Sequence, residues 1–300
     1  MDFKELTYIV TIADEGSISR AAEKLYMAQS SLSQFLQQYE AELGSRLFNR
    51  TARGVRLTAA GTSFVYHARG MLQQYHRAKS ELGDIESLQG GRIELGISTF
   101  RGGYLLPPVL KRFRELYPQV HVEITELDSV LLEERIVGGY LDISLVALPL
   151  TRLRHKTDFL MRDEVVLVAH KRHPVMNFAE QAPDGRAWIR FEDAACFEFI
   201  LGGPDTVLGR IARTEFRKRD IVPIAYNTNI TALFAAALAR SGAALALTYH
   251  SCRELSGEVT YLSLGPQGIF VELALAYPPN GYRSKATMAL GQLMHEMLRQ

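Results

Sequence analysis

The sequence contains few of the residues and patterns that mark secreted, redox-active and membrane proteins. Only two of its 300 residues are cysteine, Cys196 and Cys252, and they lie far apart. A disulfide framework is therefore not expected, and both thiols are expected to be buried in a reducing compartment. A redox switch needs an accessible thiol of low pKa, and the neighbouring residues indicate none.

No segment has the pattern of an export signal or a membrane span. The first ten residues, MDFKELTYIV, lack a basic stretch followed by an apolar run, so no secretory signal is expected. The most apolar window, 232–249, is broken by Arg240, Ser241 and Gly242, which predicts a buried helix followed by a strand. We therefore expect a cytoplasmic protein with no membrane partner.

The common catalytic motifs are also lacking. The sequence has no G-x-S-x-G, H-E-x-x-H, G-x-x-x-x-G-K-[ST] or paired cysteine motif, and its eight histidines are scattered. We therefore expect no enzymatic activity, no metal site and no cofactor. A net charge of +1 also means that the whole chain does not bind polyanions by bulk charge.

The first 61 residues contain three short helical patterns. They span about 2–14, 18–25 and 28–44, and glycines at 16 and 44 end the first and the third. Ser17 or Ser19 is suited to cap the second helix, whose Ala21–Ala22 pair allows close packing. Two short helices joined by a tight turn predict a helix-turn-helix.

The third helix has an unusual outer face. Leu32, Leu36 and Tyr39 recur at the spacing of a buried stripe. The opposite stripe holds serine and glutamine at positions 30, 33, 34 and 37, with no lysine or arginine. Such a stripe is either a solvated helix face or a surface that reads hydrogen-bonding groups.

Two further segments follow this helix. Residues 49–51 and 55–57 are suited to form a small hairpin, and no acidic residue lies between Gly44 and Arg56. From position 58 apolar residues recur in steps of four and three, which is a heptad seam and predicts a helix that pairs with another helix. The residues of this predicted dimerisation seam are Phe64, Ala68, Met71, Tyr75, Ala78, Leu82 and Ile85.

The remaining residues, 92–300, alternate strand and helix patterns. This predicts an α/β domain with largely parallel sheets. The chain length also favours about two domains.

At this point the sequence resembles the LysR-type transcriptional regulators over nearly its whole length. The resemblance rests on GSISRAAEKLYMAQSSLSQFLQQYEAELGSRLFNRTARGVRLTAAG, residues 16–61, and on weaker matches such as RFRELYP at 112–118 and GGYLDISLV at 138–146. It implies an N-terminal all-α winged helix-turn-helix at 1–61 and a long linker helix for dimerisation with a hinge at 62–91. At 92–300 it implies a two-lobed α/β effector-binding domain like a type 2 periplasmic binding protein. Lobe 1 is expected at about 92–162 and 266–300, and lobe 2 at about 163–265.

In a regulator of this kind the third helix lies in the major groove, where glutamine can pair with adenine and serine can donate or accept. Arginines of the wing bind phosphate and fix the register without reading sequence. The expected DNA-binding residues are Gln29, Ser30, Ser31, Ser33, Gln34, Gln37, Arg50, Arg53 and Arg56. The chain departs from the family pattern at Gln34 and Gln37, where basic residues are common. It also departs at Ala28, where a serine that caps the third helix is common. Ser30 is therefore expected to cap this helix instead. Residues 1–60 carry seven basic and seven acidic residues, which predicts a shallow salt dependence.

The resemblance also implies partners: an inverted-repeat promoter site bound by a homodimer within a homotetramer, a small-molecule effector, and RNA polymerase as a further candidate. Ligands of open α/β sheets bind beyond the carboxyl ends of strands, near helix N-termini. The expected effector-binding residues are Ser98, Thr99, Arg101, Asp128, Ser129, Leu201, Gly202, Thr206, Asn229 and Tyr249.

Each of these residues has a simpler alternative. The serines and threonines are also suited to act as N-caps, and the glycine as a turn residue. Arg101 either pairs with a carboxylate effector or is a solvated surface arginine. Asp128 opposes an anion there, so an effector that also carries an amine is expected.

Three other classes of protein compete with the regulator. An enzyme on this fold lacks a catalytic constellation, and an extracytoplasmic solute-binding protein has no use for residues 1–88. An architectural DNA-binding protein leaves the two-lobed domain without a role. The effector, the target genes and the sign of regulation do not follow from the sequence.

Overall fold

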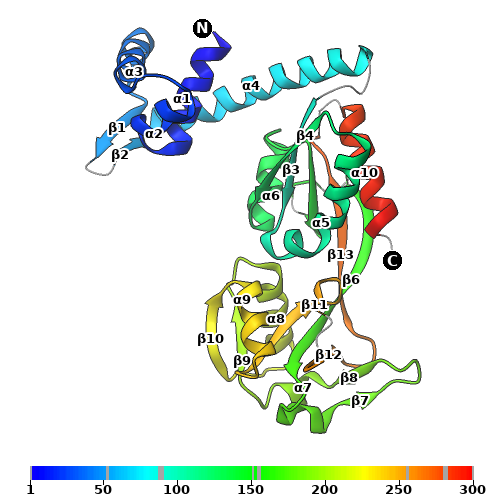
Figure 1. The fold of residues 1–300 in the computed structure, drawn as a ribbon. Coiled ribbons are helices and arrows are strands. Elements are labelled where there is room, and N and C mark those ends of the chain that lie inside the picture. Colours follow the sequence, from blue (N-terminus) through cyan, green and yellow to red (C-terminus); the bar gives the residue numbers. More distant parts are fainter. Residues whose placement is uncertain are drawn as a thin grey trace. The chain divides into compact units, whose positions relative to one another are not determined.

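The computed structural model of the chain describes residues 2–51, 54–86, 91–150, 152–153, 157–254, 257–279 and 283–298. It divides into two compact units (Figure 1). The first contains 1–86 with 138–140, and the second contains 87–137 and 141–300. Among the described residues, no helix has the length and apolar character that crossing a membrane requires.

The N-terminal unit is a winged helix-turn-helix followed by a long helix. Its elements are α1 (Phe3–Glu15), α2 (Ile18–Lys24), α3 (Gln29–Leu43), the antiparallel hairpin of β1 (Phe48–Thr51) and β2 (Gly54–Leu57), and α4 (Ala59–Glu86). Ser17 caps α2 by accepting from Arg20 N–H, and Gly16 and Gly44 end α1 and α3 in the left-handed conformation. The three predicted helices, the predicted hairpin and the predicted long helix are all present.

The expected cap of α3 is wrong. Ala28 occupies the N-cap position and has no side-chain oxygen, so no side chain caps this helix. Ser30 lies in the first turn of α3 itself, whereas a capping oxygen has to come from the residue that precedes the helix.

The β1–β2 hairpin, which is the wing of this unit, packs against the helices and completes the core of the N-terminal unit. Apolar side chains of α1, α2, α3 and the hairpin form one cluster, among them Ile9, Leu32 and Val55. Val55 N–H donates to Gly16 O at 2.9 Å, and a Cβ on Gly54 would lie only 2.2 Å from that same oxygen. Glycine at position 54 therefore allows the hairpin to pack directly against the end of α1.

The predicted seam on α4 divides into two parts. Ala68 is fully buried, and Phe64 packs against the ring of Tyr39 at 5.9 Å, so both belong to the core of their own unit. The predicted place of Ala68 in a dimer seam is therefore wrong, whereas Phe64 is only partly buried and its place in the seam stays a prediction. Met71, Tyr75 and Ala78 are exposed, and the side chains of Leu82 and Ile85 lie outside the described part of the structure.

Among its described residues, the C-terminal unit is built on one mixed sheet of eleven strands. Its strands are β3 (Gly91–Ile97), β4 (Val120–Glu126), β5 (Ile143–Ala147), β6 (Thr157–His170), β7 (Glu180–Gln181), β8 (Ala187–Ile189), β9 (Phe199–Gly202), β10 (Ala225–Ile230), β11 (Leu245–Tyr249), β12 (Val259–Leu264) and β13 (Ile269–Ala276). Its helices are α5 (Thr99–Leu116), α6 (Ser129–Val137), α7 (Phe191–Ala194), α8 (Val207–Lys218), α9 (Ala232–Arg240) and α10 (Lys285–Leu298), with 3-10 turns η1 (Pro174–Phe178) and η2 (His250–Cys252).

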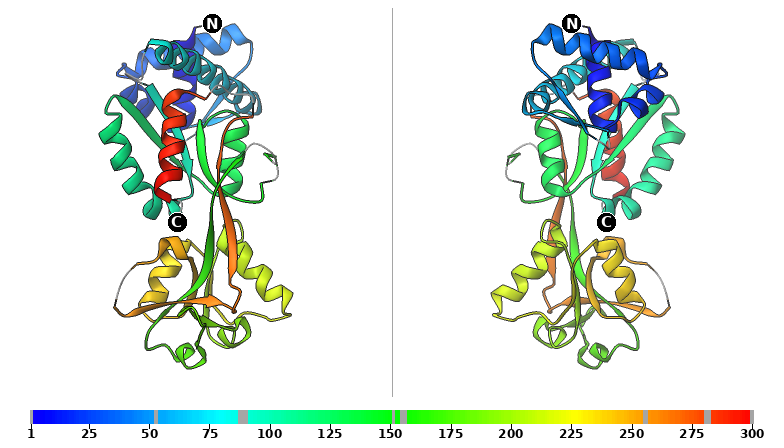
Figure 2. Two further views of the ribbon diagram at one scale, coloured as in Figure 1. Left: turned by 90° about the vertical axis from the view of Figure 1, so that its right-hand side faces the viewer. Right: turned by 90° about the vertical axis from the view of Figure 1, so that its left-hand side faces the viewer.

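Two long strands join two lobes. The main path of the sheet runs β10-β9-β11-β6-β13-β5-β3-β4, and Figure 2 shows β6 and β13 passing from one lobe to the other. We call β3–β5 with α5, α6 and α10 lobe 1, and β7–β12 with α7–α9 lobe 2. The sheet departs from the parallel expectation because β6 and β13 pair antiparallel with each other, β6 with β11 and β12, and β13 with β5.

Candidate DNA-binding and effector-binding surfaces

The polar stripe of α3 faces outward. Gln29, Ser30, Ser31, Gln34 and Gln37 are exposed, while Leu32, Leu36 and Tyr39 are buried on the other side. Ser33 is half-buried, and its hydroxyl accepts a hydrogen bond from Nη2 of Arg50 at 3.2 Å. The structure therefore joins one predicted reading residue to one predicted phosphate contact.

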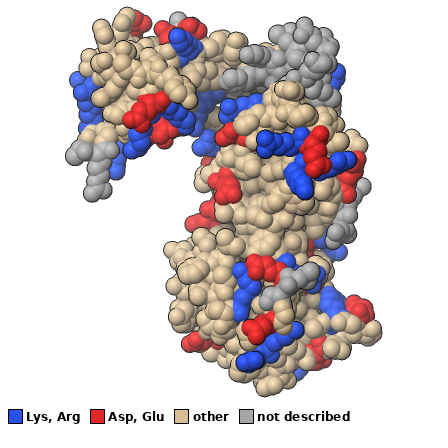
Figure 3. All heavy atoms as spheres, viewed as in Figure 1, with Lys and Arg blue, Asp and Glu red and all other residues tan. Residues whose placement is uncertain are grey.

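The wing supplies the positive charge of this surface. Arg50 and Arg56 are exposed on β1 and β2, where the register places Arg50 opposite Val55 and Arg56 opposite Asn49. Lys and Arg side chains flank this hairpin in Figure 3. Arg53 lies outside the described residues.

Five acidic residues of this unit hold groups other than the wing arginines. Glu15 accepts from Lys24 at 2.8 Å, Asp14 pairs with Arg69, and one oxygen of Glu40 accepts from two backbone N–H groups at the start of β1. Asp2 and Glu5 form the capping box of α1.

The arginines on and beside the wing are not neutralised by these acids. Within the described ranges, Arg46, Arg50 and Arg56 make no ion pair with a carboxylate. A zero net charge over residues 1–60 therefore coexists with a locally positive wing.

Five predicted effector residues lie at one edge of lobe 1. Ser98 is the N-cap of α5, but its hydroxyl makes no hydrogen bond to the helix. Thr99 and Asp128 are exposed, and Ser129 begins α6. Leu127 N–H donates to Ile97 O at 3.2 Å, so the ends of β3 and β4 are adjacent and the two helix starts are neighbours.

Arg101, the fifth of these residues, is not a solvated surface arginine. It is 3% exposed, and its guanidinium carbon lies 3.7 Å from the centre of the Tyr249 ring. Its Nε lies 3.9 Å from Oδ2 of Asp163, which is longer than a hydrogen bond. Nε and Nη2 have no hydrogen-bond partner among the described residues.

Tyr249 and Asp163 complete a buried cluster at the junction of the lobes. Asp163 on β6 accepts from Ser251 N–H at 3.0 Å and from Ser251 Oγ at 2.7 Å. Burial raises the pKa of Tyr249, so its hydroxyl stays protonated. Sequence analysis missed Asp163 and Ser251, because they lie 88 positions apart and share no local pattern.

A second contact crosses the same junction one turn further along α5. Oη of Tyr104 donates to Oε1 of Glu254 at 2.7 Å, and Nη2 of Arg240 lies 3.1 Å from the same oxygen. Burial, followed by the hydrogen bond to Glu254, raises the pKa of Tyr104 to about 12. Together with the cluster around Arg101, this contact fixes α5 of lobe 1 against the loop that follows β11 in lobe 2.

The other predicted effector residues gather at the ends of β9 and β10. Thr206 is the N-cap of α8 and accepts from Gly209 N–H at 3.0 Å. A Cβ on Gly203 would lie 3.0 Å from Oδ1 of Asn229, so these two strand ends are in contact. Arg213, which sequence analysis missed, donates to Gly202 O at 2.8 Å and to Thr228 O at 2.9 Å and holds both ends in place.

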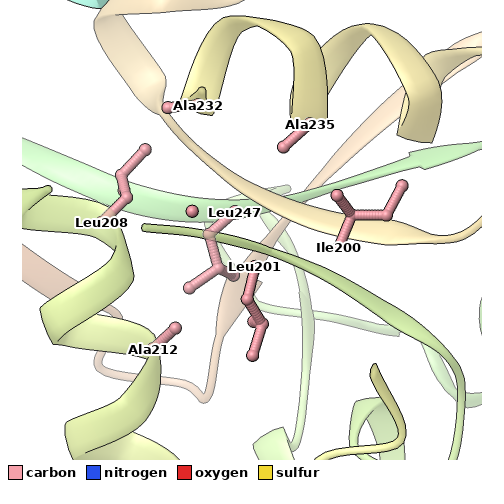
Figure 4. Close-up of a pocket in the computed structure, with 8 residues that line it drawn as sticks. Ile200, Leu201, Leu208, Ala212, Ala232, Ala235 and Leu247 are labelled. Carbon is pink, nitrogen blue, oxygen red and sulfur yellow. The ribbon is translucent and has the colours of Figure 1, made fainter. Parts of the chain in front are cut away.

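Leu201 and Gly202 line a small cavity in lobe 2. Figure 4 shows that the labelled side chains of its walls contain only carbon atoms and come from β9, α8, α9 and β11. The lining residues are Ile200, Leu201, Gly202, Leu208, Ala212, Ala232, Ala235 and Leu247. Its volume of about 10 Å³ is near the minimum for one water molecule. The cavity is therefore too small for an effector, and Leu201, which is 3% exposed, contributes mainly to packing.

One of the two expected buried thiols is exposed. Cys252 is buried beside Ser251, and burial raises the pKa of its thiol to about 11. Cys196 lies at the surface, because it follows the single turn of α7 rather than a core strand. The expectation that both are buried is wrong for Cys196.

The fold and these surfaces define a class of protein: a DNA-binding winged helix-turn-helix joined by a long helix to a two-lobed α/β ligand-binding domain. Residues 3–62 match the model of bacterial regulatory helix-turn-helix proteins of the lysR family, and residues 86–299 match the LysR substrate binding domain. The chain belongs to the LysR family, and it is a DNA-binding transcriptional regulator with a substrate-binding domain.

Relatives support this assignment. The chain is 37% identical to the HTH-type transcriptional regulator YcgK of Bacillus subtilis over 171 residues, which cover 57% of this chain and 53% of YcgK. It is 27% identical to a probable RuBisCO transcriptional regulator of Porphyra purpurea over 293 residues, which cover 96% and 91% of the two chains.

Solved structures show the same fold. CbnR, a LysR family transcriptional regulator, matches with a TM-score of 0.71 at 18% identity over the whole of both chains. A full-length OxyR variant from Pseudomonas aeruginosa matches with a TM-score of 0.70 at 21% identity, again over the whole of both chains.

Proposed function

We propose that α3 reads base pairs in the major groove while the wing arginines bind the flanking phosphates. The observation that carries this proposal is the hydrogen bond from Arg50 to Ser33, which joins the uncharged stripe of α3 to the positive wing. Phosphate contacts set register, and side-chain amides and hydroxyls supply base readout.

The test is a binding-site selection from genomic DNA with the full chain at two salt concentrations. One inverted-repeat motif near promoters supports the proposal. Gln34→Ala is then expected to weaken binding and relax specificity at particular positions. Gln38→Ala is the matched control, because Gln38 lies on the same helix and its amide already donates to Glu42 at 3.1 Å. Equal effects of the two substitutions, or recovery of no motif, would contradict the assignment of α3.

We infer that the chain dimerises through the exposed part of α4. A hollow on the N-terminal unit is lined by Phe3, His67, Gly70, Met71, Gln74 and Tyr75, and the rings of Phe3 and Tyr75 stack at 4.3 Å. A partner helix packed into this hollow would remove these exposed apolar side chains from water, which favours association. Pairing of such dimers gives the homotetramer that we propose as the active assembly, with RNA polymerase as a further partner.

Met71→Glu tests the dimer. A charge in this hollow is expected to lower the fraction of dimer in sedimentation velocity and to weaken binding to a two-half-site operator. Gln74→Glu, which places the same charge at a position that is already polar, is the control. If Met71→Glu leaves the oligomeric state unchanged, the dimer forms elsewhere.

We propose that a small-molecule effector binds where the two lobes meet, at the helix starts around Ser98, Thr99, Asp128 and Ser129 in lobe 1 and at the end of β10 around Asn229 in lobe 2. The four positions in lobe 1 carry polar side chains beside the first-turn N–H groups of α5 and α6, which favour an anionic group such as a carboxylate. Asp128 is exposed in the same set and favours an effector that also carries an amine.

Thermal stabilisation of the full chain by a panel of metabolites tests this site, since a ligand of the native state raises the Tm. The panel pairs amine-free acids with amino acids. Asp128→Asn is expected to reduce the preference for the amine-bearing compounds. An unchanged preference refutes the role of Asp128, and no stabilisation by any compound favours an architectural protein without an effector.

A further inference from the structure

Tyr26 lies in the turn between α2 and α3, and its side chain is 98% exposed. Its backbone is in the left-handed conformation, with φ +54°. This conformation is rare for a bulky residue because the Cβ approaches the following carbonyl oxygen. The side chain therefore gains nothing from burial in its own chain to offset the strained backbone.

The backbone pattern at Tyr26 is a Schellman motif. Met27 N–H donates to Ala22 O at 2.9 Å, and Tyr26 N–H donates to Glu23 O at 3.1 Å. Glycine is the usual residue at this position, and the chain itself places Gly44 and Gly242 at the same position at the ends of α3 and α9. A tyrosine there is an outlier that local structure does not explain, and such outliers cluster at functional sites.

The place of Tyr26 in the fold indicates its partner. The turn leads directly into α3, where Ala28, Gln29, Ser30 and Ser31 are all exposed. In a helix-turn-helix the first residues of the recognition helix contact base edges, so the turn before it lies at the edge of the groove beside the phosphates. Tyrosine hydroxyls are among the groups that donate to phosphate oxygens.

We propose that Tyr26 is a further DNA contact, whose hydroxyl donates to a backbone phosphate oxygen at the border of the half-site. This inference rests on the proposal that α3 is the reading helix. The contact is neutral, so it adds affinity without adding a released counterion. It sets the position of α3 in the groove and reads no base itself.

Two substitutions test the contact on the full chain with a selected operator duplex. Tyr26→Phe keeps the ring and the backbone but removes the donor. Loss of one neutral hydrogen bond weakens binding about fivefold, and a dimer on two half-sites loses about 25-fold. Tyr26→Gly is expected to weaken binding to the same degree while raising the Tm by about 3 °C, because glycine removes the left-handed strain. The slope of log Kd against log salt stays the same for both.

Asp220 provides a matched control. It is the other described non-glycine residue with positive φ, also +54°, and it occupies the same Schellman position at the end of α8 in the C-terminal unit. Asp220→Gly is expected to relieve a comparable strain and to leave operator binding unchanged.

The outcomes separate this inference from the proposal on which it rests. If Tyr26→Phe binds as tightly as the wild type, the hydroxyl contact is refuted, whatever Tyr26→Gly does. If Gln34→Ala weakens binding and both Tyr26 variants do not, α3 still reads DNA and only Tyr26 is misassigned. If none of the three weakens binding, the assignment of α3 fails as well.

Discussion

Replacing Arg101 by methionine tests the buried cluster between the lobes. Arg101 and Asp163 are 4% and 1% exposed at the side chain, and their charges are 3.9 Å apart. At an effective dielectric constant of about 20, two unit charges at this distance attract by about 4 kcal/mol. Arg101→Met also removes two buried nitrogen atoms, Nε and Nη2, that have no hydrogen-bond partner among the described residues, and this offsets about 1–2 kcal/mol of the lost attraction. We therefore expect Arg101→Met to lower the free energy of unfolding by about 2–3 kcal/mol.

The double variant Arg101→Met with Asp163→Asn separates charge from packing. Asparagine can still accept from Ser251 N–H and donate to Ser251 Oγ, so the hydrogen bonds of this site survive. With no uncompensated charge left, the double variant is expected to recover to within about 1 kcal/mol of the wild type. Urea unfolding of the full chain, followed in a double-mutant cycle, measures the coupling.

Two results would refute this reasoning. A single variant as stable as the wild type would mean that the pair at 3.9 Å contributes no net stability. A double variant no more stable than Arg101→Met would mean that the loss comes from packing against Tyr249, which lies 3.7 Å from the guanidinium, and not from the buried charge.

Four further outcomes are expected. Burial lowers the pKa of His173 below 6.5, so the unfolded chain binds more protons, and the free energy of unfolding should fall as pH falls below about 6.5. His173→Asn, whose Oδ1 can still accept from Val175 N–H, should reduce this pH dependence in calorimetry. The remaining dependence includes His250, whose pKa burial also lowers. Iodoacetamide should label Cys196 well before Cys252, whose pKa is about 11, as mass spectrometry would show. Gly54→Ala should destabilise the N-terminal unit by more than about 2 kcal/mol in urea. The slope of log affinity against log salt should be about −5 for a dimer with about six phosphate contacts, and a slope near −10 would contradict it.

The N-terminal unit could be predicted closely because its signals are local. Ser17, Gly16 and Gly44 cap or end helices through residues within a few positions of themselves, and the apolar stripe of α3 is periodic. The division of the seam on α4 could not be predicted, because Phe64 packs against elements far back in the sequence.

The apolar run EVVLVAH at 164–170 predicts a strand, but the first half of β6 gives no such signal. In residues 157–163, TDFLMRD, three charged residues flank a short apolar run at 159–161, and in the structure Phe159 is exposed while Leu160 is buried. They form a strand because β13, more than 100 positions later, pairs with them from Thr157↔Ala276 onward. A pairing of this range leaves no periodic mark in a short window.

The same limit applies to Arg101 and to the charge of the wing. A lone arginine near a helix start gives the same sequence signal whether it is solvated or buried. The contacts with Asp163 and Tyr249, which are distant in sequence, bury Arg101.

A sum of charges over residues 1–60 gives every acidic residue the same weight, whether or not a basic side chain already compensates its charge. In the structure Glu15 and Asp14 pair with Lys24 and Arg69, basic residues outside the wing, so their charges are already compensated there. The electrostatic field that DNA meets depends on which acids are already engaged, and net charge therefore understates the attraction of this surface for phosphate.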